Sequence, residues 1–232
     1  LANDGIAASG KDKLEAAGHQ VITETVPQDE LISAINDNNF EVVLVRSATK
    51  IRKDIIDACP HLKMIGRGGV GMDNIDVEYG RSKGLKVFNT PAASSQSVAE
   101  LVMAHLFGMA RGIYDSNRMM PSSGHSEFKV LKKKYAKGVE LRGKTLGVIG
   151  LGRIGQSVIK YALGNGMKVI GHDLYVPEVD IHVDVAGTDG LDVHIKGSPM
   201  KELLSKSDFI TIHVPHQNDG SAVIGSAEFE LL

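Results

Sequence analysis

The stretch GVIGLGRIGQ (Gly147–Gln156) constrains the fold more than any other part of the sequence. It joins an apolar, β-rich run to a helical pattern, and Gly150, Gly152 and Gly155 fit the spacing G-x-G-x-x-G. In such a turn the first glycine permits a tight bend, the second lets the backbone approach a pyrophosphate, and the third lets helix and strand pack closely. The N–H groups at the start of the helix then face the phosphates. The pattern predicts a dinucleotide-binding unit in the middle of the chain.

A carboxylate follows the glycine turn at the distance expected for a ribose acceptor. The next β-rich run ends in Asp173, roughly twenty residues beyond the turn. A carboxylate at this position accepts hydrogen bonds from the adenosine ribose hydroxyls and repels a 2′-phosphate. We therefore predict NAD as the cofactor in preference to NADP.

Short β-rich runs alternate with helical patterns along most of the chain, which indicates an α/β fold with parallel sheets and crossover helices. In the front half we expect strands at 19–23, 41–46, 62–66 and 85–89 and helices at 11–17, 28–38, 52–58 and 77–82. In the back half we expect strands at 144–150, 168–173 and 209–215 and helices at 154–164 and 200–205. We also expect one long helix over 95–120, then a polar connecting stretch over 121–128, and a hairpin over 180–196.

The composition excludes several classes of protein. Lys plus Arg at 26 against Asp plus Glu at 28 leave a formal net charge of −2, which gives no electrostatic reason to expect a nucleic acid or a membrane as partner. No apolar run approaches the ~20 residues needed to cross a bilayer. The single cysteine, Cys59, excludes an internal disulfide and suits a reducing compartment, so we expect a buried thiol in a cytoplasmic protein. We expect no metal site, because His182 and His194 lack a cluster of cysteines or carboxylates to complete one.

Sequence blocks on both sides of the glycine turn point to one family. They are VRSATK (Val45–Lys50), GRGGVGMDNID (Gly66–Asp76), NTPAASSQSVAE (Asn89–Glu100), LRGKTLGVIGLGRIG (Leu141–Gly155) and SDFITIHVP (Ser207–Pro215). In this order and spacing they resemble the D-isomer-specific 2-hydroxyacid dehydrogenases, and within that family most closely the enzymes that act on D-3-phosphoglycerate. The resemblance covers essentially the whole chain.

The resemblance implies an architecture of two doubly wound parallel-sheet lobes. We expect a flavodoxin-like substrate-binding lobe over residues 1–90, a connecting helix and arm over 91–143, and a Rossmann NAD-binding lobe over 144–232. It also implies a homodimer or homotetramer assembled through the NAD lobe.

The resemblance assigns the substrate contacts chiefly to the front lobe. Arg46 and Ser47 match residues that contact the charged end of the substrate, and a guanidinium with a hydroxyl suits a phosphate or carboxylate. Ser94 stands where many of the phosphoglycerate enzymes carry Asn, and its hydroxyl has a shorter reach. Asp76 is expected to cap the helix that follows it. The glycine loop GRGGVG (Gly66–Gly71) matches the family's backbone clamp on the substrate carboxylate. The expected substrate-binding residues are Arg46, Ser47, Gly68, Gly69, Val70 and Ser94.

The resemblance also extends the cofactor site beyond the glycine turn. Arg153 and Ile154 match residues that cover the pyrophosphate, and the segment that ends in Pro215 matches the lining of the adenosine side. We expect a packing role for the histidine of that segment and no role as a base. The expected cofactor-binding residues are Val70, Val98, Gly150, Gly152, Arg153, Ile154, Gly155, Asp173, His213, Val214 and Pro215.

The family's chemistry uses an imidazole, held by a carboxylate, that takes the hydroxyl proton, and an arginine that orients the substrate. The resemblance places all three after the SDFITIHVP block, and none of the nine histidines matches the catalytic one. We therefore assign no catalytic residue within 1–232. We expect the printed chain to be a fragment in which the NAD lobe is truncated.

The resemblance implies NAD-dependent oxidation of D-3-phosphoglycerate to 3-phosphohydroxypyruvate, the first step of serine biosynthesis, with a small phosphorylated 2-hydroxy acid as partner. Two alternatives stay open. One is a glyoxylate or hydroxypyruvate reductase, or another D-2-hydroxyacid dehydrogenase. The other is a binding module like the NAD-sensing corepressors of the same superfamily, which would need a peptide-binding cleft in the first lobe.

Overall fold

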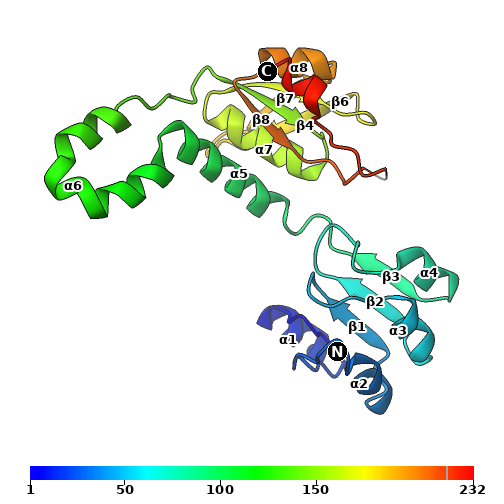
Figure 1. The fold of residues 1–232 in the computed structure, drawn as a ribbon. Helices are drawn as coiled ribbons and strands as arrows, with labels where there is room; N and C mark the ends of the chain where they lie inside the picture. Colours follow the sequence, from blue (N-terminus) through cyan, green and yellow to red (C-terminus); the bar gives the residue numbers. More distant parts are fainter. Residues whose placement is uncertain (218) are drawn as a thin grey trace. The chain divides into compact units, whose positions relative to one another are not determined.

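The computed structural model describes residues 1–217 and 219–232, and the chain divides into two compact units, Leu1–Ser94 and Ser95–Leu232. Each unit contains a parallel sheet with helices packed around it (Figure 1). The predicted α/β class with parallel sheets is therefore confirmed. The division falls after Ser94, and residues 95–143 of the segment expected as a connector belong to the second unit.

The first unit is built on a three-stranded sheet in the order β1-β2-β3, with parallel pairing throughout. Its strands are β1 (Val42–Val45), β2 (Met64–Arg67) and β3 (Lys86–Asn89), and its helices are α1 (Ala8–Ala16), α2 (Leu31–Asp37), α3 (Lys53–Ala58) and α4 (Val77–Ser82). The carboxyl ends of the parallel strands share one edge of the sheet. Residues that follow β1 and β2 are thereby brought close together.

One apolar cluster holds the first unit together. Val43 and Val45 alternate with less buried residues along β1, as expected for a strand with one face in the core. Leu31 and Ile35 lie four residues apart, and so on one face of α2, and both are fully buried in this cluster. Cys59 is 1% exposed in the same cluster, so the expected buried thiol is confirmed, and burial raises the pKa of that thiol.

The strand expected at 19–23 is not formed. Residues Leu1–Asn3 instead lie beside β1, where Ala2 pairs with Leu44 in parallel. Ile22 contributes only its carbonyl oxygen, which accepts a hydrogen bond from the N–H of Ala2 at 2.8 Å. The apolar run around Val21 thus packs against the unit without a ladder of its own.

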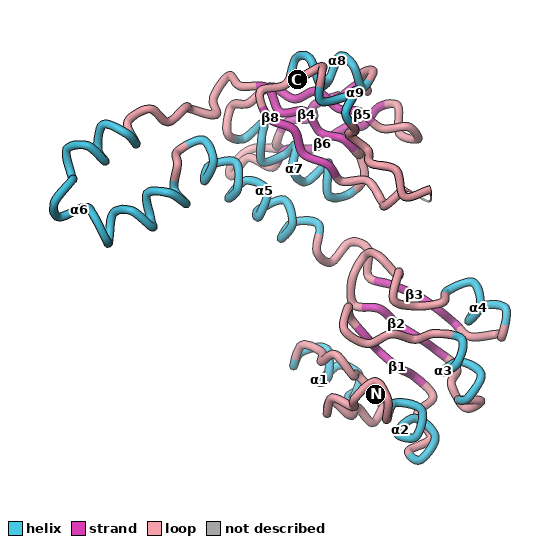
Figure 2. The backbone as a smooth tube through the Cα atoms, in the orientation of Figure 1, coloured by secondary structure: helices cyan, strands magenta, loops and turns pink. Residues whose placement is uncertain are grey.

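The second unit is built on a parallel sheet in the order β5-β4-β8, with a separate antiparallel pair β6-β7. Figure 2 shows these strands among the helices of the unit. The strands are β4 (Thr145–Ile149), β5 (Lys168–His172), β6 (Glu178–Val183), β7 (Leu191–Lys196) and β8 (Phe209–Ile212). The helices are α5 (Ser95–Ala110), α6 (Ile113–Tyr135), α7 (Arg153–Gly164), α8 (Met200–Lys206) and α9 (Ser226–Phe229).

Helices cover both faces of this sheet because β4 is apolar on both sides. Leu146 and Val148 belong to the cluster formed with α5 and α7, whereas Ile149 belongs to the cluster formed with α8. Gly147 lies under α8, and a Cβ there would come within 2.7 Å of Leu203 Cδ2. The missing side chain therefore lets helix and strand pack closely. This is the doubly wound arrangement that the sequence predicts for the NAD lobe.

The prediction of a single long helix over 95–120 is wrong, because α5 ends and α6 begins at Arg111–Gly112. Gly112 has φ 60°, a left-handed conformation that ends a right-handed helix and that glycine adopts without strain. The second helix, α6, runs through Pro121 and includes the stretch 121–128, so the polar connector expected there is wrong. Its backbone departs from helical geometry at Glu127, with φ −118° and ψ 20°. None of the helices in the described parts of the chain is long and apolar enough to cross a membrane.

The hairpin expected over 180–196 is confirmed as the antiparallel pair β6-β7. Ile181 and Ile195 face the cluster that contains α7. On the other face each histidine pairs with a carboxylate of the opposite strand at 2.8 Å, His182 Nδ1 with Asp192 and His194 Nδ1 with Asp180. Among the described residues no group of three or more side chains is arranged to hold a metal ion.

Candidate functional site

The glycine turn joins β4 to α7, and each glycine in it meets different surroundings. Gly150 has φ 100°, and a Cβ there would also lie 2.6 Å from the carbonyl oxygen of His213. A Cβ on Gly155 would overlap the carbonyl oxygen of Gly150, so this position needs glycine for the fold itself. Gly152 has φ −71°, and nothing lies within 4 Å of the position of its Cβ. The protein alone therefore gives no reason for glycine at 152, and the space beside it is free for a ligand.

The backbone after the turn offers unpaired donors. The first helical N–H with a partner is that of Gln156, which donates to the carbonyl of Gly152 at 2.9 Å. In the described chain the N–H groups of Gly152, Arg153, Ile154 and Gly155 have no acceptor. Such donors at the start of a twelve-residue helix, with its partial positive charge, suit a pyrophosphate. The side chain of Arg153 is exposed beside them.

Asp173 lies directly after β5 and is fixed by three backbone N–H groups. Oδ2 accepts from Leu151 at 2.8 Å, and Oδ1 accepts from Tyr175 at 2.8 Å and Val176 at 3.1 Å. Burial alone would raise the pKa of Asp173, but these hydrogen bonds lower it below its usual range, so the carboxylate is ionised near neutral pH. A carboxylate oxygen accepts two hydrogen bonds, so Oδ2 retains capacity for a ribose hydroxyl.

The segment after β8 closes the other side of the turn. The N–H of His213 donates to the carbonyl of Ile149 at 2.7 Å, which holds this backbone against Gly150. The ring of His213 shares a 2.8 Å hydrogen bond with the hydroxyl of Thr211, and burial lowers the pKa of the imidazole. The ring is therefore a neutral packed group at pH 7. Val214 packs against the α8 cluster, Pro215 is exposed, and Val98 is half-buried on α5.

In the first unit, the anion-binding residues expected from the sequence meet at the carboxyl edge of the sheet. Arg46 and Ser47 follow β1 and are exposed. The stem of Arg46 passes the glycine loop that follows β2, because a Cβ on Gly68 would lie 3.6 Å from Arg46 Cγ. The guanidinium of Arg46 has no acceptor among the described residues, so it is free to bind an anion.

Two backbone N–H groups of the glycine loop have acceptors within the protein. The N–H of Gly68 donates to the carbonyl of Val45 at 2.8 Å, and that of Gly69 donates to Thr90 Oγ1 at 2.9 Å. Both glycine amides therefore hold the loop to its neighbours. Within the part of the chain that the structure describes, Val70 and Gly71 are the loop residues whose N–H groups have no acceptor. Ser94 lies half-buried at the end of this unit.

A second arginine, which the sequence reasoning missed, lies in this loop. Nε of Arg67 donates to Asn74 Oδ1 at 2.8 Å and to the carbonyl of Arg46 at 3.2 Å. Its Nη1 would lie 2.5 Å from a Cβ on Gly69, so this end of the guanidinium lies against that glycine. Nη1 and Nη2 have no acceptor in the described chain. The sequence carried the signal, because Arg67 lies inside the block GRGG.

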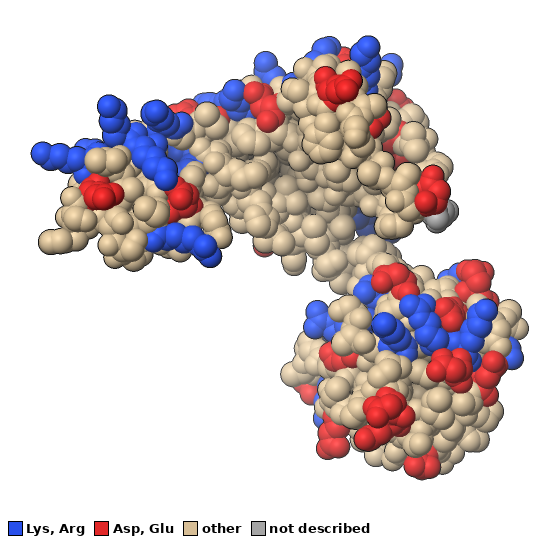
Figure 3. Space-filling view, viewed as in Figure 1, with Lys and Arg blue, Asp and Glu red and all other residues tan. Residues whose placement is uncertain are grey.

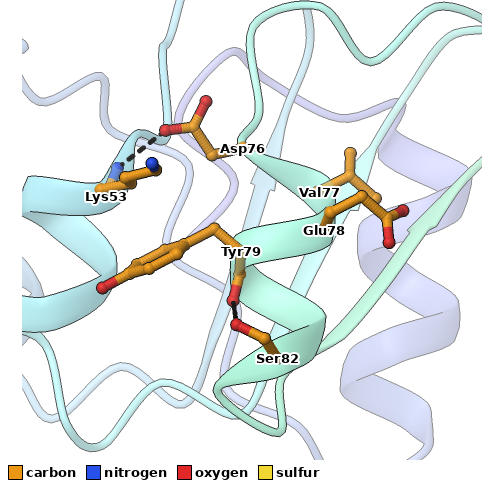
Figure 4. Close-up of a pocket in the computed structure, with 6 residues that line it drawn as sticks. All are labelled: Lys53, Asp76, Val77, Glu78, Tyr79 and Ser82. Atoms are coloured by element: carbon orange, nitrogen blue, oxygen red, sulfur yellow. Dashed lines mark hydrogen bonds between the residues drawn. The ribbon is translucent and has the colours of Figure 1, made fainter.

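The expectation that Asp76 caps the helix after it is wrong. The Asp76 carboxylate makes no cap to α4 and instead accepts from the backbone N–H of Lys53 at 3.0 Å and from Arg52 Nη1 at 2.9 Å. The parallel bridge between Ile51 and Ile75 brings Asp76 beside the start of α3. Figure 4 shows the open recess there, with Lys53 and Asp76 on one side and Tyr79 beside them. None of the expected site residues lines it.

Charge is distributed unevenly over the surface. Lys and Arg alternate with Asp and Glu over the visible face of the first unit, whereas Lys side chains gather on α6 (Figure 3). Lys132 and Lys133 are exposed, and Lys134 forms an ion pair with Asp115. The run Lys132–Lys134 is thus a solvated helix face.

Known proteins resemble most of this chain. The family model of the D-isomer specific 2-hydroxyacid dehydrogenase catalytic domain matches residues 1–211. A D-3-phosphoglycerate dehydrogenase of Methanocaldococcus jannaschii is 41% identical over 219 residues, which are 94% of this chain and 39% of that protein. A hydroxypyruvate reductase of Thermotoga maritima is 44% identical over 196 residues, which are 84% of this chain and 58% of that protein. The chain therefore spans only part of the length of these relatives.

A solved structure shows the same fold. The NAD⁺-bound 3-phosphoglycerate dehydrogenase of Entamoeba histolytica superposes with a TM-score of 0.72 at 28% sequence identity. The match covers 100% of this chain and 67% of that protein.

Proposed function

Because this chain belongs to the D-isomer specific 2-hydroxyacid dehydrogenase family, we propose that the whole protein uses NAD to oxidise D-3-phosphoglycerate to 3-phosphohydroxypyruvate. The observation that carries the choice of substrate is the pair of guanidinium groups of Arg46, beside the glycine loop, and Arg67, within it. Each has nitrogen donors without an acceptor in the described chain. Two such groups suit a substrate that carries a phosphate as well as a carboxylate. The relative from Methanocaldococcus jannaschii bears the name of this activity.

The second unit fits NAD. The unpaired N–H groups of residues 152–155 suit the pyrophosphate, and the open space beside Gly152 lets it approach the backbone. Asp173 is held ionised where a ribose hydroxyl is expected, and its charge opposes a 2′-phosphate. NAD, when bound, supplies the hydride acceptor. The protein residues bind and orient the two reactants.

None of the described residues is assigned the proton transfer. His213 lies in the SDFITIHVP block, but its ring is bonded to Thr211 and burial lowers the pKa of the imidazole. Its backbone, which packs on Gly150, accounts for its place in the site.

Reduction of hydroxypyruvate is the second candidate, and the 44% identity to the reductase of Thermotoga maritima favours it. The substrates of the two candidate reactions differ by one phosphate group. Steady-state assays of the whole protein with NADH and 3-phosphohydroxypyruvate, hydroxypyruvate or glyoxylate therefore decide between them. We expect kcat/KM to be highest for the phosphorylated acid, and equal or higher values for hydroxypyruvate would refute this choice. Neither relative's name supports the corepressor-like alternative.

We also propose that the protein forms a homo-oligomer through its second unit. Large apolar side chains on α5 and α6 are exposed in the single chain, among them Leu101 at 57%, Met109 at 66% and Tyr114 at 70%. Such a row is typical of a protein interface. Sedimentation analysis of the wild type and of Met109→Lys tests this proposal, with a loss of the oligomer as the expected result. The cytoplasmic location stays a prediction.

A further inference from the structure

The loop that carries Arg46 and Ser47 is tied down at both ends by one carboxylate. Asp4 Oδ2 accepts from the backbone N–H of Arg46 at 2.6 Å and from that of Thr49 at 3.1 Å. The hydroxyl of Thr49 donates to Asp4 Oδ1 at 2.5 Å. The two residues between, Ser47 and Ala48, are exposed. The carboxylate of Asp4 thus serves as acceptor for the backbone N–H groups at the two ends of this loop.

A side-chain amide holds the same loop from its carbonyl side. Asn74 Nδ2 donates to the carbonyl of Arg46 at 2.8 Å and to that of Thr49 at 2.6 Å. Asn74 Oδ1 in turn accepts from Nε of Arg67, so one amide connects the loop to the second arginine. Asn74 therefore contacts both arginines of the anion site, Arg46 at its carbonyl oxygen and Arg67 at its Nε.

Two of the side chains that make these contacts, those of Thr49 and Asn74, are buried. Thr49 is 4% exposed and Asn74 is 5% exposed, so a partner lost there would not be replaced readily by water. Burial alone would raise the pKa of Asp4, but the hydrogen bonds from the Thr49 hydroxyl and from the backbone of Arg46, Thr49 and Ala48 lower it. Asp4 is thus an ionised acceptor at neutral pH.

We propose that Asp4 and Asn74 are positioning residues that hold Arg46, Ser47 and Arg67 in the geometry for the phosphorylated substrate. The proposal rests on the proposed function of the whole protein. The proposal predicts an effect on anion binding opposite to that of charge alone, because a carboxylate near an anion site by itself weakens anion binding. Removing the charge of Asp4 strengthens anion binding if the carboxylate acts only through its charge. It weakens anion binding if the carboxylate positions the loop.

The test is Asp4→Asn in the whole protein, since asparagine keeps the shape but offers one acceptor oxygen in place of two. We expect the KM for 3-phosphohydroxypyruvate to rise on the order of ten- to hundredfold, with kcat changed less than about threefold and the Kd for NADH unchanged. Thr49→Val should behave in the same direction, whereas Thr49→Ser, which keeps the hydroxyl, should restore the wild-type KM. Asp57→Asn is the matched control, because Asp57 pairs with Tyr79 and Lys83 elsewhere on the unit.

Amide hydrogen exchange gives a readout that does not depend on turnover. The N–H groups of Arg46 and Thr49 should exchange faster in Asp4→Asn than in the wild type, while those of β1 and β2 stay protected. An unchanged or lowered KM, or wild-type exchange at both amides, overturns the proposal. If the wild type reduces no 2-oxo acid, the proposed function fails. The positioning role is then still decided by two measurements on the wild type and Asp4→Asn, amide exchange at Arg46 and Thr49 and the binding of inorganic phosphate.

Discussion

Asp173 accepts a hydrogen bond from the backbone N–H of Leu151 across 2.8 Å, which ties this candidate ribose acceptor to the glycine turn. The two residues come from the ends of neighbouring parallel strands, β4 and β5. The candidate pyrophosphate cradle and the candidate sugar acceptor are therefore parts of one rigid element. A substitution of Asp173 should therefore affect the binding of both the pyrophosphate and the ribose of the dinucleotide.

The first prediction concerns the choice of cofactor. The wild type should bind NADH more tightly than NADPH, and Asp173→Ala should weaken NADH binding by roughly ten- to hundredfold, as for the loss of hydrogen bonds to a charged group. The preference over NADPH should shrink, because the repelling charge is gone. Fluorescence titration with both cofactors measures this, with the exposed Asp184→Ala as control. Tighter binding of NADPH by the wild type would contradict the assignment.

The second prediction separates two glycines of the same turn. Gly155→Ala should destabilise the protein by about 1–3 kcal/mol or more, because its Cβ overlaps the carbonyl oxygen of Gly150. Gly152→Ala should leave stability within about 0.5 kcal/mol, because its φ of −71° suits alanine and nothing lies within 4 Å. It should nevertheless weaken NADH binding, since the methyl group occupies the ligand's space. Urea unfolding and NADH titration of both variants provide the test, and an unaffected NADH Kd in Gly152→Ala would place the pyrophosphate elsewhere.

The third prediction concerns the anion-binding arginines. Arg46→Ala and Arg67→Ala should each raise the KM for 3-phosphohydroxypyruvate by roughly ten- to hundredfold, the cost of a charge-assisted hydrogen bond, without changing the Kd for NADH. Arg81→Ala is the control, because Arg81 pairs with Glu78 on the surface of α4. Steady-state kinetics decide, and a KM within about twofold of wild type would make the substituted arginine a plain surface residue.

The fourth prediction concerns the pH dependence of the hairpin β6-β7. The hydrogen bond to Asp180 raises the pKa of His194 above its usual value of ~6.5. The folded hairpin thus favours the protonated ring, and its contribution to stability is full below pH ~6.5 and is lost as the pH rises through the raised pKa. NMR titration of the His194 ring should show the raised pKa in the wild type and a lower one in Asp180→Asn. Equal values in the two proteins would contradict the pairing.

The sequence by itself determined the α/β class and the glycine turn, and it singled out Asp173 as the candidate ribose acceptor. These features depend on local patterns: apolar runs of strand length, glycine at a fixed spacing, and a carboxylate at the end of the next strand. It also placed most helices and strands of the two sheets close to their observed bounds. It failed at 19–23, where an apolar run lacks a neighbouring strand to pair with, and at Gly112, where one left-handed residue divides two helices whose side-chain patterns run on.

Only the tertiary structure decided which donors are free. The N–H groups of Gly68 and Gly69 are used by Val45 and Thr90, which are distant in sequence, so spacing within the loop could not reveal it. Asp76 turns to the start of α3 for the same reason, because a parallel bridge brings that N–H within reach. Asp4 and Asn74 meet the loop after β1 from segments 42 and 28 residues away from Arg46. Hydrogen-bond partners of this kind are fixed by how strands are ordered in the sheet, and a linear pattern of residues does not contain that order.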